Sequence, residues 1–395
     1  MQRSCIVAYA DKWGVDGCAF VGAQSVLEVT MKSRTFFKVT TVLVGMGLAL
    51  CFATACSKKA DQSAAIEKYG SNTLKIYLPG EYTSETLIPN FEKQFGVKVI
   101  VELFDSNEMM YAKVQAGDKY DVLIPSDYMI ERLLAQKLLQ PLDKSVMTNM
   151  KELDKAVLNL SFDPDNTYSM PYFWGNVGLV YNKTKVDPKV IAEQGYDILL
   201  NTDYAGQIYW YDSERDSFMV ALKALGFSMN SESKDEINKA YDWLLKMNDT
   251  MKPTYVTDEV IDNMSNGLKN IAIVYSGDAA FILNENKDMD YIAPMQGTNV
   301  WYDSMVIPAN AENPKLANEF INYVMSYKAS YGNSEAVGYA SPNARVLTEM
   351  KAPGAIYEHN RAYLPRAGFE KDEIFHDNET IRAMISELWI KVKAH

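Results

Sequence analysis

Residues 74–128 have the sequence LKIYLPGEYTSETLIPNFEKQFGVKVIVELFDSNEMMYAKVQAGDKYDVLIPSDY, in which two kinds of segment alternate. Segments 74–78, 97–103 and 121–125 are short and apolar and predict strands. Segments 84–95 and 108–116 each precede a glycine and predict helices, as does the segment from Ser126 to Leu139. Strands that alternate with helices favour a mainly parallel sheet flanked by helices, which is an α/β fold.

The alternation continues beyond residue 128. Segments 207–211, 270–275 and 305–307 predict strands, and segments 217–225, 237–247, 315–327 and 379–392 predict helices. A chain of 395 residues exceeds one ordinary hydrophobic core, so two lobes are expected. Ligands of parallel α/β sheets bind beyond the carboxyl ends of the strands, so the loops at those ends are candidates for a binding site.

The N-terminal segment has the pattern of an export signal. Lys32, Arg34 and Lys38 precede an apolar run over residues 39–52, which is followed by Ala53-Thr54-Ala55-Cys56. This pattern resembles a bacterial lipoprotein signal, in which the cysteine carries lipid and becomes the first mature residue. It implies an upstream over-extension over 1–30, a signal peptide over 31–55, lipid on Cys56 and a tether over 56–70. An ordinary secretory signal and an uncleaved anchor are the alternatives.

The composition argues against several classes of protein. The net charge of −12 disfavours nucleic acid as a partner, because nucleic acid requires basic patches. All four cysteines lie within the first 56 residues, and the three histidines are far apart. Zinc-protease, serine-hydrolase and nucleotide-binding motifs are absent from the sequence. We therefore expect no enzyme, no cofactor and no metal, with an anchored hydrolase that uses two carboxylates as an alternative.

Aromatic and acidic residues occur together in five segments, most of them just after predicted strands. These segments are 81–82 (EY), 126–128 (SDY), 212–216 (DSERD), 275–278 (YSGD) and 301–304 (WYDS). Aromatic faces attract cations and cover methylene groups, while carboxylates accept hydrogen bonds from ammonium groups. A site that combines both suits an alkyl amine with separated positive charges.

From about Leu74 onward, the chain resembles the spermidine/putrescine-binding receptors of bacterial polyamine ABC transporters. The matching motifs are GEY at 80–82, DSNEMMYAKV at 105–114, YDVLIPSDY at 120–128, YSMPYFWG at 168–175, DSERDSF at 212–218, YSGDAAF at 275–281, WYDSMVIPANA at 301–311 and VGYASPN at 337–343. The resemblance implies a two-lobed periplasmic-binding-protein fold of type II with a hinge. By this resemblance the first lobe takes residues 71–175 and 302–345, and the second takes 176–301 and 346–395.

The resemblance also implies a function and a site. The protein is expected to capture a protonated polyamine, spermidine or putrescine, between its lobes and to deliver it to the membrane subunits of an ABC importer. We expect a lipid-anchored monomer in the periplasm or on the outer face of the cytoplasmic membrane. The candidate ligand-binding residues are Glu81, Tyr82, Ser126, Tyr128, Asp216, Tyr275, Asp278, Trp301, Asp303 and Tyr339.

Some positions depart from the pattern of the family. Pro79 stands where a ligand-stacking tryptophan is usual, and Ser213 replaces an acid of the spermidine-type members. Asp278 instead supplies an acid that resembles the putrescine-type pattern. The preference between the two polyamines therefore stays open, and a receptor for another amine or for ferric iron is the alternative.

Overall fold

The computed structural model describes residues 62–395. The predicted over-extension, the signal peptide over 31–55 and the lipid site at Cys56 lie outside the described residues. No helix within residues 62–395 is both long enough and apolar enough to cross a membrane.

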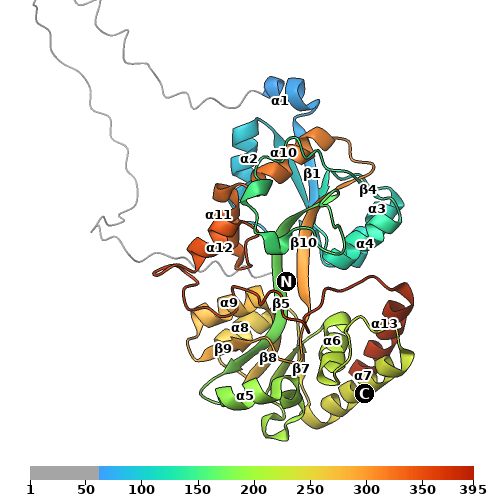
Figure 1. Cartoon of the computed structure of the whole chain (residues 1–395), viewed down its shortest axis with the longest axis vertical. Helices are drawn as coiled ribbons and strands as arrows, with labels where there is room; N and C mark the ends of the chain where they lie inside the picture. Colours follow the sequence, from blue (N-terminus) through green and yellow to red (C-terminus); the bar gives the residue numbers. More distant parts are fainter. Residues whose placement is uncertain (1–61) are drawn as a thin grey trace, which may run out of the picture. The chain divides into compact units, whose positions relative to one another are not determined.

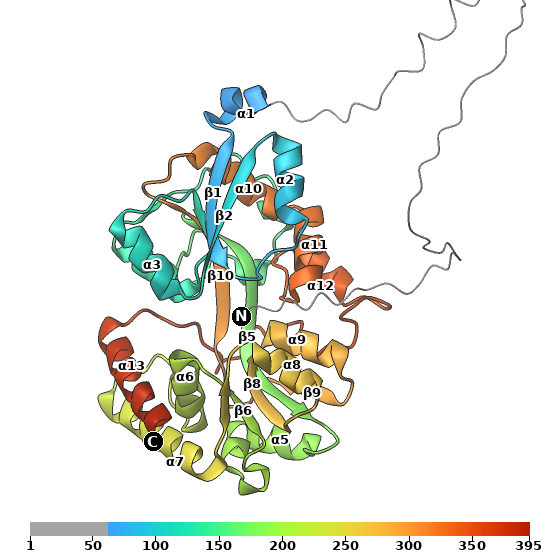
Figure 2. The ribbon, with the colours of Figure 1, turned by 180° about the vertical axis from the view of Figure 1, so that it is seen from behind.

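The first lobe is built on the parallel strands that residues 74–128 predict. Strand β1 (Thr73–Pro79) pairs with β2 (Lys98–Phe104) on one side and with β3 (Val122–Leu123) on the other. The intervening helices are α2 (Leu87–Phe95), α3 (Asn107–Ala116) and α4 (Asp127–Ala135). Figure 2 shows α2 and α3 on opposite sides of this sheet. Helix α4 is shorter than predicted, because the backbone turns at Lys137 (φ 56°) into strand β4 (Leu139–Gln140).

Helices from later in the chain complete the first lobe. They are α10 (Pro314–Val324), α11 (Tyr327–Val337) and α12 (Ala344–Met350). Residues 62–69, which the sequence analysis assigned to the tether, form helix α1 (Gln62–Tyr69). Its buried residues Ala65 and Tyr69 are four positions apart and therefore lie on one face. The Tyr69 hydroxyl donates to Glu319 of α10 at 3.1 Å, so this helix is part of the lobe.

The second lobe repeats the α/β plan. Strand β6 (Ile208–Tyr211) pairs in parallel with β7 (Thr254–Val256) and with β8 (Ile271–Tyr275). Strand β9 (Met289–Ile292) completes this part of the sheet. The helices are α5 (Pro188–Gln194), α6 (Glu214–Ala224), α7 (Lys234–Met251), α8 (Glu259–Ser265), α9 (Ser276–Glu285) and α13 (Glu379–Ala394). Short 3-10 turns cover 195–200 and 202–204 in this lobe, and 150–152 and 155–157 in the first lobe.

Two long strands, β5 (Ser169–Asn182) and β10 (Val300–Pro308), run from one lobe into the other (Figure 1). They pair antiparallel at the centre of the sheet order β2-β1-β3-β10-β5-β8-β6-β7, with a register shift between Asp303 and Ser304. The predicted parallel pairing holds for β1 with β2 and β3, and for β6 with β7 and β8. Strands β5 and β10 instead pair antiparallel with each other and with their neighbours in each lobe, so the sheet is mixed. Every residue of both strands is buried, so neither strand shows the alternation that marks a half-exposed strand.

Candidate ligand-binding site

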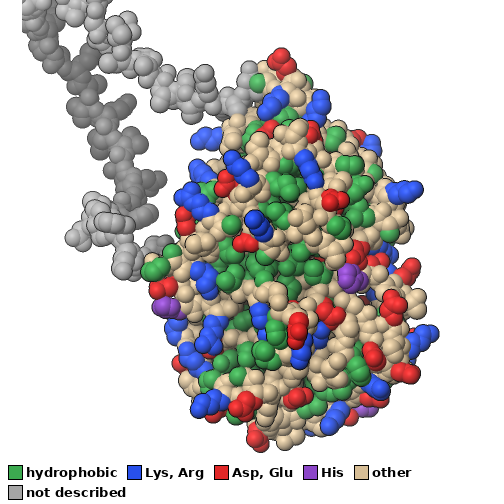
Figure 3. All heavy atoms as spheres, in the orientation of Figure 1, with side chains coloured by type: hydrophobic (Ala, Val, Ile, Leu, Met, Phe, Trp, Pro, Cys, Tyr) green, Lys and Arg blue, Asp and Glu red, His purple; other side chains and the backbone are tan. Residues whose placement is uncertain are grey.

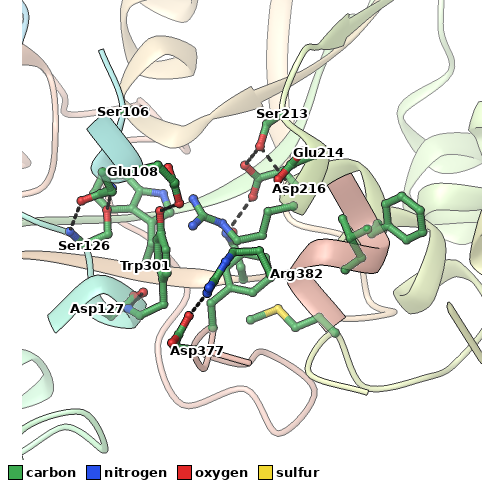
Figure 4. Close-up of a pocket in the computed structure, with 18 of the residues that line it drawn as sticks. Ser106, Glu108, Ser126, Asp127, Ser213, Glu214, Asp216, Trp301, Asp377 and Arg382 are labelled. Carbon is green, nitrogen blue, oxygen red and sulfur yellow. Dashed lines mark hydrogen bonds and ion pairs between the residues drawn. The ribbon is translucent and has the colours of Figure 1, made fainter. Parts of the chain in front are cut away.

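A cavity of about 770 Å³ lies between the lobes, within the usual size range of small-molecule sites. Its lining includes nine Asp and Glu residues but only three Lys and Arg residues. Figure 4 shows that Ser126 and Asp127 of the first lobe face Ser213 and Asp216 of the second across this space. On the outer face shown in Figure 3, acidic and basic side chains are interspersed. The acidic character is thus a property of the cavity rather than of this face.

Asp303 of β10 is a buried carboxylate with one unused oxygen. Its Oδ2 accepts a hydrogen bond of 2.5 Å from the Tyr82 hydroxyl. Its Oδ1 is buried and has no hydrogen-bond partner among the described residues. Burial raises the pKa of Asp303 above its usual value, although the neighbouring hydroxyls of Tyr82 and Ser126 oppose this rise. Because a buried acceptor without a partner is costly, Oδ1 is suited to a donor that arrives with a ligand.

Asp216 is also buried, but its carboxylate is fully engaged. It lies in the first turn of α6, where Ser213 is the N-cap residue. Its Oδ2 accepts from the Ser213 hydroxyl at 2.7 Å and from the Tyr275 hydroxyl at 2.6 Å. Its Oδ1 accepts from the Asn299 amide at 2.9 Å. Three neutral donors and the N-terminus of the helix therefore hold this negative charge in place.

Aromatic rings from both lobes form one wall of the cavity. The Trp301 ring meets the edges of Tyr275 and Tyr339 at centroid distances of 6.2 and 5.1 Å. Two glycines permit this packing. A Cβ at Gly175 would lie 2.3 Å from the Trp301 ring, and one at Gly277 would lie 2.2 Å from the Tyr339 ring. The rings can therefore occupy these positions only because both neighbours lack side chains.

A partly buried arginine also lines the cavity. The Arg215 guanidinium lies 3.9 Å from the centroid of the Tyr128 ring and 5.0 Å from that of Phe375. The Tyr128 hydroxyl donates to Glu108 at 3.0 Å. Nearby Tyr128 and Asp216 raise the pKa of Arg215, although burial opposes this effect. The guanidinium is therefore a fixed positive charge inside a mostly acidic cavity.

Asp127 links two elements that line the cavity, the N-terminus of α4 and strand β10. Its carboxylate accepts from the backbone N–H groups of Tyr302 at 2.9 Å and of Tyr128 at 2.7 Å. Burial raises the pKa of Asp127 to about 7, although these two amides oppose the rise. The carboxylate thus ties the start of α4 to β10 immediately beside Asp303.

The structure brings together eight of the ten candidate residues. Those that line the cavity are Tyr82, Ser126, Tyr128, Asp216, Tyr275, Trp301, Asp303 and Tyr339. Glu81 is exposed, has a φ of 52° and lies outside the lining. Asp278 lies behind the aromatic wall, where it accepts from the Tyr339 hydroxyl at 3.1 Å. Pro79 lines the cavity where the family pattern has a tryptophan.

Sequence reasoning assigned no role to three residues that shape the cavity, namely Asp127, Arg215 and Asn299. The family resemblance places Phe375 or His376 about where spermidine-type members have a glutamine, and both residues line the cavity. Asp127 and Arg215 stand inside motifs quoted above, so the sequence places them beside predicted site residues. It does not show which groups their side chains contact. Asn299 is brought in only by tertiary folding, and no local pattern marks it. Within the described residues, no group of three or more His, Cys, Asp or Glu side chains could hold a metal ion.

Comparisons with known proteins agree on one group. The family model of bacterial extracellular solute-binding proteins matches residues 86–358. The spermidine/putrescine-binding periplasmic protein of Escherichia coli K12 is 34% identical over 327 residues, covering 82% of this chain and 92% of the relative. The putrescine-binding periplasmic protein PotF of the same organism is 32% identical over 308 residues, covering 72% and 83%.

Solved structures point the same way. A putative spermidine/putrescine ABC transporter protein from Listeria monocytogenes superposes with a TM-score of 0.72 at 36% identity, covering 82% of this chain and 99% of the other. The spermidine/putrescine substrate-binding protein PotD of Streptococcus pneumoniae superposes with a TM-score of 0.71 at 34% identity and the same coverage.

Proposed function

The chain belongs to the bacterial extracellular solute-binding proteins, and on that premise we propose that it captures a protonated polyamine, spermidine or putrescine, in the cavity between its lobes. The family consists of solute-binding receptors rather than enzymes. We accordingly assign the chain no catalytic step. Its relatives bear the names of periplasmic polyamine-binding proteins and of parts of ABC transporters.

The observation that carries this proposal is the unused Oδ1 of Asp303. An alkylammonium group brings three donors and a positive charge, so it would satisfy this oxygen and also offset the burial of the carboxylate. A neutral sugar would supply the hydrogen bond without the charge. An anionic ligand would place a second negative charge in a cavity already rich in carboxylates.

The rest of the ligand is assigned by the same reasoning. The rings of Tyr82, Tyr275 and Trp301 would cover the methylene chain, while Asp216 would attract a second ammonium group. Ser126 and Tyr128 would border the chain on the first-lobe side. Glu81 and Asp278 lie outside this lining, so their roles in binding rest on the family pattern alone.

The proposal also includes the predicted lobe boundaries, the importer and the lipid anchor. The lobe boundaries at residues 175, 301 and 345 would mark the crossings at which the lobes move when they close over the ligand. Closure would then present the loaded form to the membrane subunits of an importer. Lipid on Cys56 would anchor a monomer outside the cytoplasmic membrane, so that it stays close to that importer.

One titration tests the proposal. Calorimetry of the purified protein with putrescine, cadaverine, spermidine and spermine should give one-to-one binding for at least one of them. The amine-free alcohol 1,4-butanediol is the matched control for putrescine, because it keeps the chain and loses both charges. Failure of all four amines to bind, or equal binding of the diol, would contradict the proposal. Binding of ferric iron instead would support the alternative receptor.

A further inference from the structure

A segment of the second lobe reaches across the cavity to the first lobe. This segment, residues 371–378 and here called the strap, precedes α13. Its residues Phe375, His376 and Asp377 line the cavity. The strap contacts α4 through Glu131, which does not line the cavity itself. Glu131 thus has a contact between the lobes without a direct contact to the space for the ligand.

The strap is fixed firmly to its own lobe. Glu373 forms a parallel bridge with Asn299, and its backbone N–H donates to the Thr298 carbonyl at 2.9 Å. The Glu373 carboxylate pairs with the buried ammonium group of Lys223 and accepts from the Ser228 hydroxyl at 2.5 Å. Burial of the ion pair and these extra donors make this end of the strap rigid. The strap is therefore expected to move together with the second lobe.

The contact with the first lobe is made at two points. Glu131 Oε1 lies 2.7 Å from His376 Nδ1, and Oε2 accepts from the Asp377 backbone N–H at 2.9 Å. Because an ionised carboxylate only accepts, the imidazole Nδ1 is the donor in the first bond. The Glu131 side chain is only 24% exposed. Two donors on one carboxylate fix both the distance and the orientation of the strap relative to α4.

A second contact lies one helical turn away and supports the same alignment. Tyr128 precedes Glu131 by three residues on α4, so the two side chains are neighbours on one face of that helix. Phe375 precedes His376 on the strap, and Arg215 contacts the rings of both Tyr128 and Phe375. The first lobe and the strap therefore meet directly at Glu131, and Arg215 connects them indirectly at Tyr128 and Phe375.

We propose that Glu131 is a latch residue, which accepts from His376 and Asp377 in the closed form and so slows release of the ligand. This inference rests on the proposed function for the nature of the ligand. Glu131 acts through the lobes and not on the ligand, so it should change the lifetime of the closed form for every polyamine alike.

Dissociation rates measured by stopped-flow tryptophan fluorescence test this latch. Glu131→Ala removes both acceptors and is expected to raise koff about tenfold for putrescine and spermidine alike, while kon changes less than about twofold. His376→Asn keeps a donor near the place of Nδ1, so its koff should stay within about threefold of the wild-type value. The koff of His376→Ala should lie between the values for His376→Asn and Glu131→Ala.

Matched controls come from pairs within the second lobe. Glu387 pairs with Lys391 inside α13, and His395 approaches Asp249 of α7. Glu387→Ala and His395→Gln should leave koff unchanged. A koff of Glu131→Ala within about twofold of wild type would overturn the latch. An equal rise in koff for Glu387→Ala would also overturn it. The thermal midpoints of all variants show whether any loss of binding reflects unfolding.

The latch and the proposed function can fail separately. If wild type binds no polyamine, the proposed function is wrong, and the latch is then tested without a ligand. X-ray scattering should give a larger radius of gyration for Glu131→Ala than for Glu387→Ala, because the lobes open more readily. Equal radii would overturn the latch, whatever the ligand is.

Discussion

Asp303 and Asp216 lie in the same cavity and are both buried, but their carboxylates are bonded differently. Asp216 accepts from three neutral donors, and the N-terminus of α6 adds a favourable dipole. Asp303 accepts from Tyr82 on one oxygen, and its Oδ1 has no partner among the described residues. The protein itself stabilises the charge on Asp216, whereas much of the stabilisation of Asp303 is left to a ligand.

This difference separates two kinds of contribution. A carboxylate that the protein satisfies contributes to the stability of the fold and attracts a cation at the same time. A carboxylate that the protein leaves short of donors costs stability until the ligand binds. The two residues should therefore respond differently when each is replaced by its neutral isostere, asparagine.

The largest effect on binding is expected for Asp303→Asn. The ligand loses a charged partner in a buried site, which costs about 2–5 kcal/mol of binding free energy. The free energy of unfolding should not fall, because the substitution removes a buried charge that lacks a full set of donors. Calorimetry and urea unfolding measure the two quantities. Asp242→Asn, at an exposed position of α7, is the control. Unchanged affinity for every polyamine would disprove the role of Asp303.

Asp216→Asn should reduce both quantities. The single amide oxygen cannot replace two carboxylate oxygens that serve three donors, so unfolding should be easier by about 1–2 kcal/mol and affinity about tenfold lower. Asp235→Asn is a close control, because Asp235 also lies in the first turn of a helix with a serine N-cap but is exposed. An unfolding free energy equal to that of wild type would show that the three hydrogen bonds to Asp216 do not stabilise the fold.

Tyr275→Phe should have a smaller effect. It removes the hydroxyl that donates to Asp216 at 2.6 Å and keeps the ring against Trp301. The loss of one donor to a charged acceptor should lower affinity for each polyamine about three- to tenfold. Titrations of Tyr275→Phe and Tyr275→Ala separate the hydroxyl from the ring. If both variants lose affinity equally, the ring contributes nothing and the contact lies in the hydroxyl alone.

The smallest effect on binding is expected for Asp278→Asn. Burial raises the pKa of Asp278 to about 7, well above the value of about 3.9 for a free carboxyl. Between these values the folded state binds more protons than the unfolded state, so the stability supplied by Asp278 falls as the pH rises from about 4 to about 7. Asparagine does not titrate. The stability of wild type relative to Asp278→Asn should therefore fall by about 3 kcal/mol between pH 4.5 and pH 8.

Urea unfolding at the two pH values measures this change, and a titration at pH 8 measures the affinity. Because Asp278 lies behind the Tyr339 ring, the affinity should change less than about threefold. A loss of more than tenfold would restore Asp278 to the ligand-binding set that the sequence suggests.

The fold was predictable where a local pattern carries it. Strands β1 and β2 and helices α3 and α13 lie within a few residues of their predicted bounds. Short apolar segments mark the two strands, and Gly117 marks the end of α3. Strand β5 was missed as an element, since all of its residues are buried and its faces do not alternate. The antiparallel pairing of β5 with β10 was not predictable from local sequence, because register depends on partners more than a hundred residues away.

The residue types of the candidate site were predictable from the sequence, but the hydrogen bonds among them were not. Carboxylates and aromatic residues at strand ends pointed to Asp303, Asp216 and Trp301, and all three line the cavity. The sequence does not distinguish a carboxylate with three donors from one with an unused oxygen. That distinction depends on Asn299 and on Tyr82, which reach the two aspartates across 83 and 221 residues of chain.

The register shift of β10 falls between Asp303 and Ser304, within the pair of strands that joins the lobes. Removing one residue there would reverse the facing of every side chain from 304 to 308 in its sheet. The residue to which we assign the ligand's counter-charge therefore also sets the strand register at the junction of the lobes. Redesign for a new cargo would have to spare this strand and work on the surrounding loops, where changes in length leave the register intact.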